Sequence, residues 1–405
     1  MVSISKKRKG FSMKKWLVII ISVLLIAVTL IWFNINPHLR VLILDPPENE
    51  NVLFWSTKQR DAGFRLIEQL DILPKRTIKA SEDTSQFKIG NSLDFEKEAL
   101  DQLMKSQRLA SLIVLHNGKL VLEEYGLDFS AEGKWTSFSV AKSFTSTLIG
   151  AAIKDGYINS LSDSVSLYIP DMQGSNYDNV TIEQLLTMTS GIKWDEDYSD
   201  PNSDVSKFNF HTPDEGIDAT ASYMRSLPRA AEPGKVWLYS TGETNLIGLL
   251  ISQATNQTLS DYLSEKVWSK IGMEQDASWV LGKTGHEISG CCIQATTRDF
   301  ARFGQFILNG AIVDGESIVP DGWFEKATTT QFKTSNPKLG YGFQWWTSPD
   351  GSFQGRGIFG QGIFIDPTRK LVIAVNGNWE KASSRELTEQ RLQLYKLIQD
   401  LVDDN

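Results

Sequence analysis

Residues 137–156 read SFSVAKSFTSTLIGAAIKDG, and this stretch decides much of the fold. Small and apolar side chains recur in it at helical spacing, and Asp155-Gly156 is a typical helix stop. The pattern predicts a buried helix from about Ser139 to Lys154. Ser139 stands at the first turn of this helix, and Lys142 follows three positions later on the same face.

Ser139 and Lys142 can form a nucleophile and its base. The hydroxyl would lie in the positive field of the helix end, beside unpaired backbone N–H groups. Burial disfavours the ammonium form of a lysine, and a neutral amine can accept the serine proton. Ser-X-X-Lys occurs six times in the chain, but only Ser139 opens a long apolar helix. On spacing alone, the alternative is that Ser139 caps the helix and Lys142 lies at the surface.

Strand patterns flank this helix in the sequence. SLIVLHNGKLVLEEYG predicts two antiparallel strands near residues 111–125, joined at Asn117-Gly118. Helical stretches fill about residues 157–280, and apolar strand patterns return in YGFQWWT, GSFQGRGIF, GIFIDP and KLVIAVNG, before a C-terminal helix near Ser384–Val402. We therefore expect an α/β (α+β) fold, with an antiparallel sheet from both chain ends, flanking helices and an all-helical lobe.

The N-terminus carries a predicted transmembrane anchor. WLVIIISVLLIAVTLIWF, residues 16–33, forms a helix of about 27 Å, close to the ~30 Å of a bilayer core. Basic residues precede it, which predicts a cytoplasmic tail at 1–15 and an extracytoplasmic body. A cleaved signal peptide is the alternative, but no small-X-small site follows. Residues 34–95 read as a connector with one amphipathic helix near Ala62–Leu73.

Composition excludes several classes of protein. The chain has 405 residues with 41 basic and 49 acidic side chains, and six of the basic ones lie in the N-terminal tail. The acidic body is poorly suited to nucleic acid. Cys291 and Cys292 are adjacent, about 3.8 Å apart at Cα and below the usual disulfide range, so we expect free, buried thiols. The four scattered histidines do not indicate a metal site.

Common catalytic and cofactor motifs do not explain the chain. G-x-S-x-G, H-E-x-x-H and the P-loop are absent from the sequence. Residues 355–360, GRGIFG, have dinucleotide-motif spacing, but a predicted strand follows them instead of a helix. We expect no metal or organic cofactor.

WTSFSVAKSFTSTLIG resembles the active-site segment of the serine β-lactamase and penicillin-binding-protein superfamily. The similarity is to its class C-like part, and most of all to the branch of 6-aminohexanoate-dimer hydrolases and esterases. Four later segments resemble that branch in the same order, namely LLTMTSGIKWDEDY, WLYSTGETNLIG, GCCIQATTRDFARFGQFILNG and GQGIFIDP. The resemblance implies one hydrolase domain over about residues 96–405, with a β-lactamase/transpeptidase-like fold.

The resemblance also implies site residues. Its second motif falls on Tyr239-Ser240-Thr241, and Tyr239 would relay the proton to the leaving group. Without the resemblance, Tyr239 reads as a core aromatic. Many relatives have Asn at the position of Thr241. Tyr198 resembles a loop tyrosine that closes over amide substrates, although an exposed loop position is the alternative.

The third motif of the family is not the obvious match. Lys283-Thr284-Gly285 spells K-T-G, but it lies before the segment GCCIQATTRDFARFGQFILNG, which in the family comes before the third motif. The late strand with Gly355-Arg356-Gly357 is therefore the better candidate. The backbone N–H of Ile358, with that of Ser139, would form the oxyanion hole, and Gly357 would border the substrate. The absence of Lys or His at its first position counts against efficient penicillin hydrolysis. Gln361 is either a pocket wall or, more in keeping with its place after Gly360, a turn residue.

These observations predict a membrane-anchored serine hydrolase. Ser139 would be acylated by a small-molecule amide or ester in a cleft between the two lobes, with Lys142 as base and Tyr239 as relay. One alternative is a cell-wall D,D-peptidase or β-lactamase. A protein of another class, a catalytically silent binding or scaffold protein, is the second alternative. The sequence does not indicate an oligomeric state.

Overall fold

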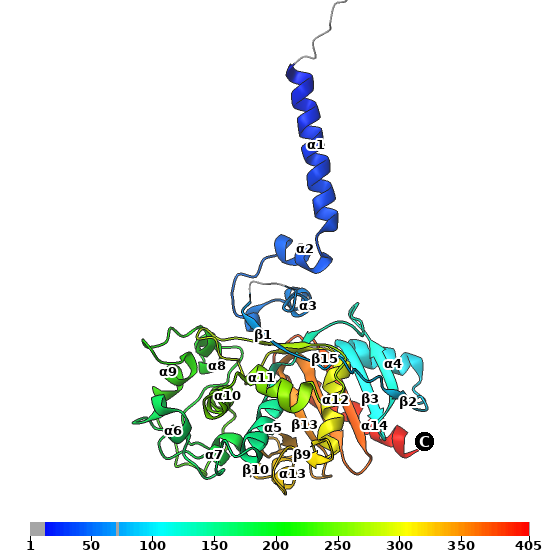
Figure 1. Cartoon of the computed structure of the whole chain (residues 1–405). Coiled ribbons are helices and arrows are strands. Elements are labelled where there is room, and N and C mark those ends of the chain that lie inside the picture. Colours follow the sequence, from blue (N-terminus) through cyan, green and yellow to red (C-terminus); the bar gives the residue numbers. More distant parts are fainter. Residues whose placement is uncertain (1–12, 70–72, 405) are drawn as a thin grey trace, which may run out of the picture.

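The computed structural model describes residues 13–69 and 73–404. Residues 1–12, which hold most of the predicted basic tail, lie outside this part. The first element, α1 (Met13–Asn34), has 22 residues, and none of them is buried. Its most apolar stretch of 18 residues has a mean hydropathy of 2.9. It projects away from the body in Figure 1. The helix is long and apolar enough to cross a membrane, and a signal sequence has the same properties.

The core of the body is a nine-stranded sheet built from both ends of the chain. The predicted hairpin is confirmed as β3 (Leu109–His116) and β4 (Lys119–Tyr125), with Asn117 and Gly118 at φ of 51° and 71° in the turn. Strand β15 (Leu371–Gly377) lies antiparallel beside β3. The full order is β10-β11-β12-β13-β14-β15-β3-β4-β2. The other members are β2 (Lys88–Ile89), β10 (Phe332–Lys333), β11 (Gly340–Tyr341), β12 (Trp346–Thr347), β13 (Phe353–Gly357) and β14 (Gln361–Asp366).

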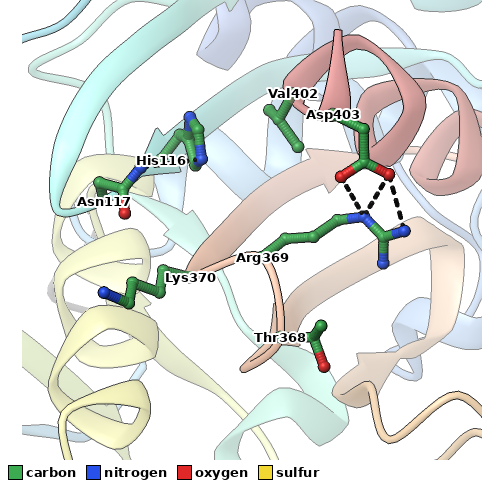
Figure 2. Close-up of a pocket in the computed structure, with 7 residues that line it drawn as sticks. All are labelled: His116, Asn117, Thr368, Arg369, Lys370, Val402 and Asp403. Carbon is green, nitrogen blue, oxygen red and sulfur yellow. Dashed lines mark hydrogen bonds and ion pairs between the residues drawn. The ribbon is translucent and has the colours of Figure 1, made fainter. Parts of the chain in front are cut away.

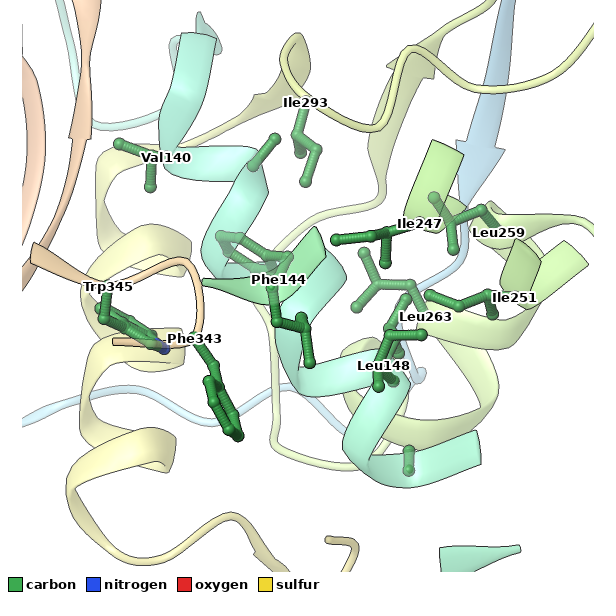
Figure 3. Close-up of a cluster of buried hydrophobic side chains, with 14 of the residues drawn as sticks. Val140, Phe144, Leu148, Ile247, Ile251, Leu259, Leu263, Ile293, Phe343 and Trp345 are labelled. Carbon is green, nitrogen blue, oxygen red and sulfur yellow. The ribbon is translucent and has the colours of Figure 1, made fainter. Parts of the chain in front are cut away.

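Helices cover both faces of this sheet (Figure 1). On one face lie α5 (Ala141–Lys154) and α12 (Thr297–Leu308), which share a hydrophobic core with the helical lobe. Phe144 of α5 stacks on Phe303 of α12, and Figure 3 shows Phe144 and Leu148 among apolar side chains of the lobe. On the other face, α4 (Lys97–Ser106) and α14 (Arg385–Asp403) enclose a second core. The expected mixed fold with flanking helices is confirmed.

The helical lobe lies between α5 and the later strands. Its main helix is α10 (Thr241–Thr255), which packs on α5. The shorter helices are α6 (Val165–Tyr168), α7 (Ile182–Leu186), α8 (Asp204–Lys207), α9 (Ala219–Arg225) and α11 (Leu259–Leu263), and α13 (Trp323–Ala327) follows α12. Small sheets complete the body with β5 (Trp135–Thr136), β6 (Ala277–Val280), β7 (Ile293–Ala295), β8 (Ile312–Val313) and β9 (Glu316–Ser317).

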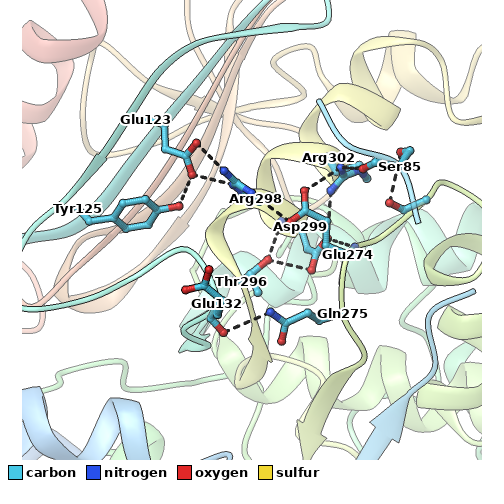
Figure 4. Close-up of polar contacts among 11 residues, drawn as sticks. Ser85, Glu123, Tyr125, Glu132, Glu274, Gln275, Thr296, Arg298, Asp299 and Arg302 are labelled. Atoms are coloured by element: carbon cyan, nitrogen blue, oxygen red, sulfur yellow. Dashed lines mark hydrogen bonds and ion pairs between the residues drawn. The ribbon is translucent and has the colours of Figure 1, made fainter. Parts of the chain in front are cut away.

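The segment between α1 and the sheet is folded onto the body. It contains α2 (Pro37–Leu44), α3 (Thr57–Leu66) and β1 (Lys75–Ile78), and β1 pairs with β6. The helix expected near Ala62 starts earlier, because Ser56 and Gln59 form a capping box. Further along, Arg302 of α12 donates to the carbonyl of Ser85, as Figure 4 shows. The connector is therefore held to the hydrolase domain by strand pairing and polar contacts.

Candidate active site

Ser139 lies in a tight turn at the start of α5. The turn is the 3₁₀ helix η2 (Phe138–Val140), and Phe138 has a φ of 41°, which is unusual for a residue with a side chain. Ser139 is 8% exposed. The N-cap of α5 is Val140, and no side chain caps the helix. The Ser139 hydroxyl is therefore not used as a cap, which was the alternative that spacing allowed.

Lys142 is buried and faces Ser139. Its side chain is one of the largest that are fully buried, at 1% exposure. The Nζ atom lies 3.1 Å from Ser139 Oγ and 3.0 Å from Thr241 Oγ1, and donates to the carbonyl of Gly290 at 2.8 Å. Burial lowers the pKa of Lys142 to about 8, although the negative charge of Glu196 raises it. A neutral amine next to the hydroxyl is thus accessible near neutral pH.

Tyr239 completes the group of three predicted catalytic side chains. Its ring centroid is 5.2 Å from Lys142 Nζ, and its side chain is half-buried. Burial and the charge of Glu196 raise the pKa of Tyr239, while a hydrogen bond with Ser139 and the charge of Arg356 oppose the rise. Tyr239 immediately precedes α10, whose N-cap is Ser240. The structure therefore brings Ser139, Lys142 and Tyr239 together from two helix starts.

Glu196 organises the edge of this site, and sequence reasoning missed it. Its carboxylate accepts hydrogen bonds from Thr241 N at 2.9 Å, from the Thr241 hydroxyl, from Tyr198 OH at 2.7 Å and from the Trp194 indole. Thr241 in turn contacts Lys142. The acidic run in WDEDY was visible, but nothing in the sequence singles out Glu196 from the two aspartates beside it.

The predicted third-motif strand runs past the start of α5. On β13, a Cβ added at Gly355 would lie 2.9 Å from Ser143 Oγ, and one at Gly357 would lie 2.7 Å from the Ser137 carbonyl. Glycine is needed here because the strand passes so close to the turn that carries Ser139. Ile358 follows directly, at the start of the 3₁₀ helix η6 (Ile358–Gly360).

Lys283-Thr284-Gly285 lies elsewhere, in a turn between β6 and β7. Lys283 Nζ donates to the carbonyl of Phe210 at 2.7 Å, and the Thr284 hydroxyl bonds the Asp218 carboxylate. The turn is thus tied to the helical lobe, and its side chains are engaged in structural contacts.

Tyr198 and Gln361 differ in their contacts with the site residues. Tyr198 is half-buried and reaches it through Glu196, and burial together with the Glu196 charge raises its pKa well above the usual value. Gln361 is 3% exposed and has both ends of its amide bonded to backbone, to Ile358 O at 2.9 Å and to Gly377 N at 2.8 Å. These contacts favour the interpretation of Gln361 as a residue that supports the turn.

The cysteine pair corrects the sequence prediction. Cys291 and Cys292 form a disulfide, so the expectation of two free, buried thiols is wrong, and both residues are half-buried. Their Cα atoms are 3.7 Å apart, and Cys292 takes a left-handed backbone with a φ of 79°, which turns the second residue back toward the first. The pair directly follows Gly290, whose carbonyl accepts from Lys142.

Aromatic side chains border Tyr239 on the outer side. Trp346 stacks on Tyr239 at 5.6 Å between ring centroids, and Trp237 contacts Trp346 at 5.8 Å. Both tryptophans are half-buried. They form an apolar wall beside the three polar groups, and no motif in the sequence indicated it.

One hollow of the body lies away from Ser139. A pocket of about 300 Å³ lies where the β3–β4 turn meets the end of α14, and Figure 2 shows Arg369 paired with Asp403 in it. Residues 13–69 and 73–404 contain no group of three or more His, Cys, Asp or Glu side chains arranged to hold a metal ion.

The chain is similar in sequence to known proteins. The Beta-lactamase family model matches residues 97–396. The 6-aminohexanoate-dimer hydrolase of Paenarthrobacter ureafaciens is 28% identical over 302 residues, which are 71% of this chain and 76% of that protein. A β-lactamase of Pseudomonas fluorescens is 27% identical over 43% of this chain and 48% of its own length.

Solved structures show the same fold. A candidate 6-aminohexanoate-dimer hydrolase from Bacillus anthracis superimposes with a TM-score of 0.74 at 24% identity, covering 87% of this chain and 97% of that chain. A class C β-lactamase gives a TM-score of 0.55 at 18% identity, covering 73% of this chain and 92% of that chain.

Proposed function

The chain belongs to the β-lactamase family and is a serine hydrolase, and from this premise we propose that it cleaves an amide or ester through an acyl-enzyme on Ser139. The observation that carries the proposal is the 3.1 Å contact between the buried Lys142 Nζ and Ser139 Oγ. A hydroxyl is a weak nucleophile until a base removes its proton. Lys142, with a pKa of about 8, contacts Ser139 and can do so, and the Tyr239 phenolate is the alternative base, since Tyr239 also hydrogen-bonds Ser139.

The reaction proceeds in two halves. Neutral Lys142 accepts the Ser139 proton as Oγ bonds to the substrate carbonyl carbon, and the backbone N–H groups of Ser139 and Ile358 stabilise the negative oxygen. Tyr239 donates its proton to the departing nitrogen or oxygen and is reprotonated from Lys142. Water then attacks the acyl-enzyme with the same groups in reverse order, which releases the acid and restores Ser139.

The substrate class follows from the surroundings of Tyr239. The tryptophan wall of Trp237 and Trp346 suits an apolar carbon chain next to the scissile bond. The relative from Paenarthrobacter ureafaciens is named for hydrolysis of a 6-aminohexanoate dimer, which supports linear amides for this chain. The third motif reads Gly355-Arg356-Gly357 and lacks the Lys that the family usually has at its first position. Penicillins and cell-wall peptides therefore rank second as candidate substrates.

We further propose that α1 is retained as a membrane anchor, with the hydrolase domain on the extracytoplasmic side. The support is its length of 22 residues, its apolar surface, which is not buried against the body, and the basic residues that precede it. Acidic substrates or nucleic acids are not suggested by the negatively charged body.

Ser139→Ala tests the catalytic proposal. We expect hydrolysis of p-nitrophenyl esters to fall by about 10³-fold or more, because the acyl-enzyme forms on the Ser139 hydroxyl, and labelling by a fluorophosphonate to disappear. Ser335→Ala is the matched control, since Ser335 begins another Ser-X-X-Lys and is exposed. Mass spectrometry locates the label.

The outcome decides among the alternatives. Hydrolysis that survives in Ser139→Ala contradicts the role of Ser139. If the intact protein neither hydrolyses esters and short amides nor takes the label, it is the silent binding protein. A stable adduct of a fluorescent penicillin on Ser139, without amide hydrolysis, would instead identify a penicillin-binding enzyme.

A further inference from the structure

Behind the third-motif strand lies a second polar pocket. The side chains of β13 alternate, so Gly355 and Gly357 face the turn of Ser139 while Gln354 and Arg356 face α14 on the opposite side of the sheet. Arg356 Nη2 donates to Thr388 Oγ1 of α14 at 3.1 Å. The pocket lies between β13, β14 and α14, and its polar lining comes from Gln354, Arg356, Gln361, Trp379, Thr388, Arg391 and Tyr395.

Three N–H donors in this lining are buried without an acceptor. They are Gln354 Nε2, Trp379 Nε1 and Arg391 Nη2. Their residues are 2%, 6% and 5% exposed. Leaving one such donor unpaired costs about 1–3 kcal/mol, and a charged one costs more. Three of them around one hollow indicate that an acceptor belongs there.

The pocket also carries positive charge with no counterion. Arg391 donates to Gln107 Oε1 at 3.0 Å and to Gly360 O at 3.1 Å, both neutral groups. Arg356 bonds only the neutral Thr388 and lies over the Trp346 ring. Burial and the neighbouring Arg391 lower the pKa of Arg356. Among the described residues that line the pocket there is no Asp or Glu, and neither arginine forms an ion pair there.

We propose that this pocket binds one small monovalent anion, with chloride as the simplest case. The cavity has a volume of about 20 Å³, which is room for one water molecule or one monatomic ion. A water molecule would bring two more donors and no charge into a hollow that already has too many donors. An anion accepts from Gln354, Trp379 and Arg391 together and neutralises the two guanidinium groups.

The site has a consequence for catalysis that rests on the proposed function. Arg356 lies next to Gly357 and Ile358, the residues that border Ser139 and supply the proposed oxyanion N–H. An anion that fixes Arg356 and Gln354 against α14 holds β13 in place from behind. The bound ion therefore raises the turnover number with little change in KM, because it acts on geometry and not on substrate contact.

The test measures thermal unfolding of the full chain in detergent without substrate. Chloride replaces gluconate, which is too large for the pocket, at constant ionic strength. We expect chloride to raise the Tm by about 2 °C or more at saturation. Arg391→Gln should lose the response. Gln354→Glu supplies a tethered carboxylate to the same donors, so this variant should be insensitive to chloride and folded without it.

Arg385→Gln is the matched control on the same helix, because Arg385 is exposed and pairs only with Glu389. It should respond to chloride as the wild type does, and so should Ser139→Ala, which separates this test from that of the catalytic proposal. A wild-type Tm unchanged by chloride, bromide and nitrate would mean that water fills the pocket, and it would overturn the proposal. An equal rise in all variants would reveal a general salt effect and overturn it as well.

Discussion

Two features of its surroundings change the pKa of the Lys142 amine in opposite directions. Burial at 1% exposure favours the neutral form, while Glu196, linked to it through Thr241, favours the ammonium. The resulting pKa of about 8 lies well below the value of a solvated lysine. Since a base must be unprotonated to act, kcat/KM for an ester should rise as the pH passes through about 8.

Glu196→Gln tests the origin of that value. The negative charge of Glu196 raises the pKa of Lys142, so its removal should lower this pKa and move the rising limb of the kcat/KM profile to lower pH. The pH dependence of p-nitrophenyl ester hydrolysis gives the result. Asp197→Asn is the control, because Asp197 is exposed and bonds Ser199. A limb that stays in place or moves upward contradicts the assignment of Lys142 as the base.

At the scale of the elements, strand β13 passes close to the start of α5, and this close approach requires glycine at position 357. Gly357→Ala should move the strand away from Ser139, because the added Cβ would lie 2.7 Å from the Ser137 carbonyl and 3.1 Å from the Cβ of Phe138. We expect the turnover number to fall about 10- to 100-fold through loss of oxyanion contact, with a smaller change in KM.

The matched control for this substitution is Gly282→Ala, because a Cβ there meets nothing nearer than 3.7 Å. Steady-state kinetics of both variants, with circular dichroism to verify folding, give the comparison. Equal kinetics for Gly357→Ala and the wild type would argue that β13 is not the third-motif strand.

Helix α3 supports the site although it precedes the family domain at residues 97–396. Phe64 of α3 is 1% exposed and contacts Phe138 at 5.2 Å and Phe359 at 6.0 Å between ring centroids. These two residues adjoin Ser139 and Ile358. The segment between the anchor and the domain therefore packs directly behind both proposed donors of the oxyanion hole.

Phe64→Ala should consequently lower both stability and turnover. A buried Phe→Ala change costs about 3–5 kcal/mol, and here the cavity opens behind Phe138. Phe95→Ala is the comparison, since the partly buried Phe95 packs against the core on the other face of the sheet. Kinetics below the Tm of each variant separate the effects. Turnover that falls no further in Phe64→Ala than in Phe95→Ala would remove the catalytic part of this prediction.

For the whole molecule, the proposed anchor predicts where the protein is found. With α1 retained, the intact chain should stay in the membrane fraction after alkaline carbonate washing and should be released by detergent, because a spanning helix buries its apolar surface in lipid. N-terminal mass analysis of the recovered protein provides the measurement. A soluble product that begins beyond residue 33 would show that the helix is a cleaved signal.

Local patterns predicted those parts of the molecule that depend on neighbours in the sequence. The hairpin at Asn117-Gly118, helix α5 and the contact of Ser139 with Lys142 all rest on residues within a few positions of each other. The class of fold followed from the order of such segments. The second and third motifs needed the family resemblance, because single tyrosines and glycines carry little signal of their own.

Other parts could not be predicted because they depend on distant contacts. Glu196 reaches Lys142 through Thr241, which lies on another helix, and Gly290 presents its carbonyl from a loop. The pairing of Cys291 with Cys292 depends on a left-handed backbone that the sequence does not signal. Phe64 lies 74 positions before Phe138 and contacts it only in the folded body.

The sheet order has a consequence for how the chain matures. Strand β3 lies between β4 and β15, so one of its edges can be paired only by residues 371–377, near the end of the chain. Until residues 371–377 have been synthesised, the apolar, eight-residue strand β3 has unpaired backbone groups along that edge, and another chain can pair with them. A ribosome that stalls late would thus leave a product that is both inactive and prone to aggregate.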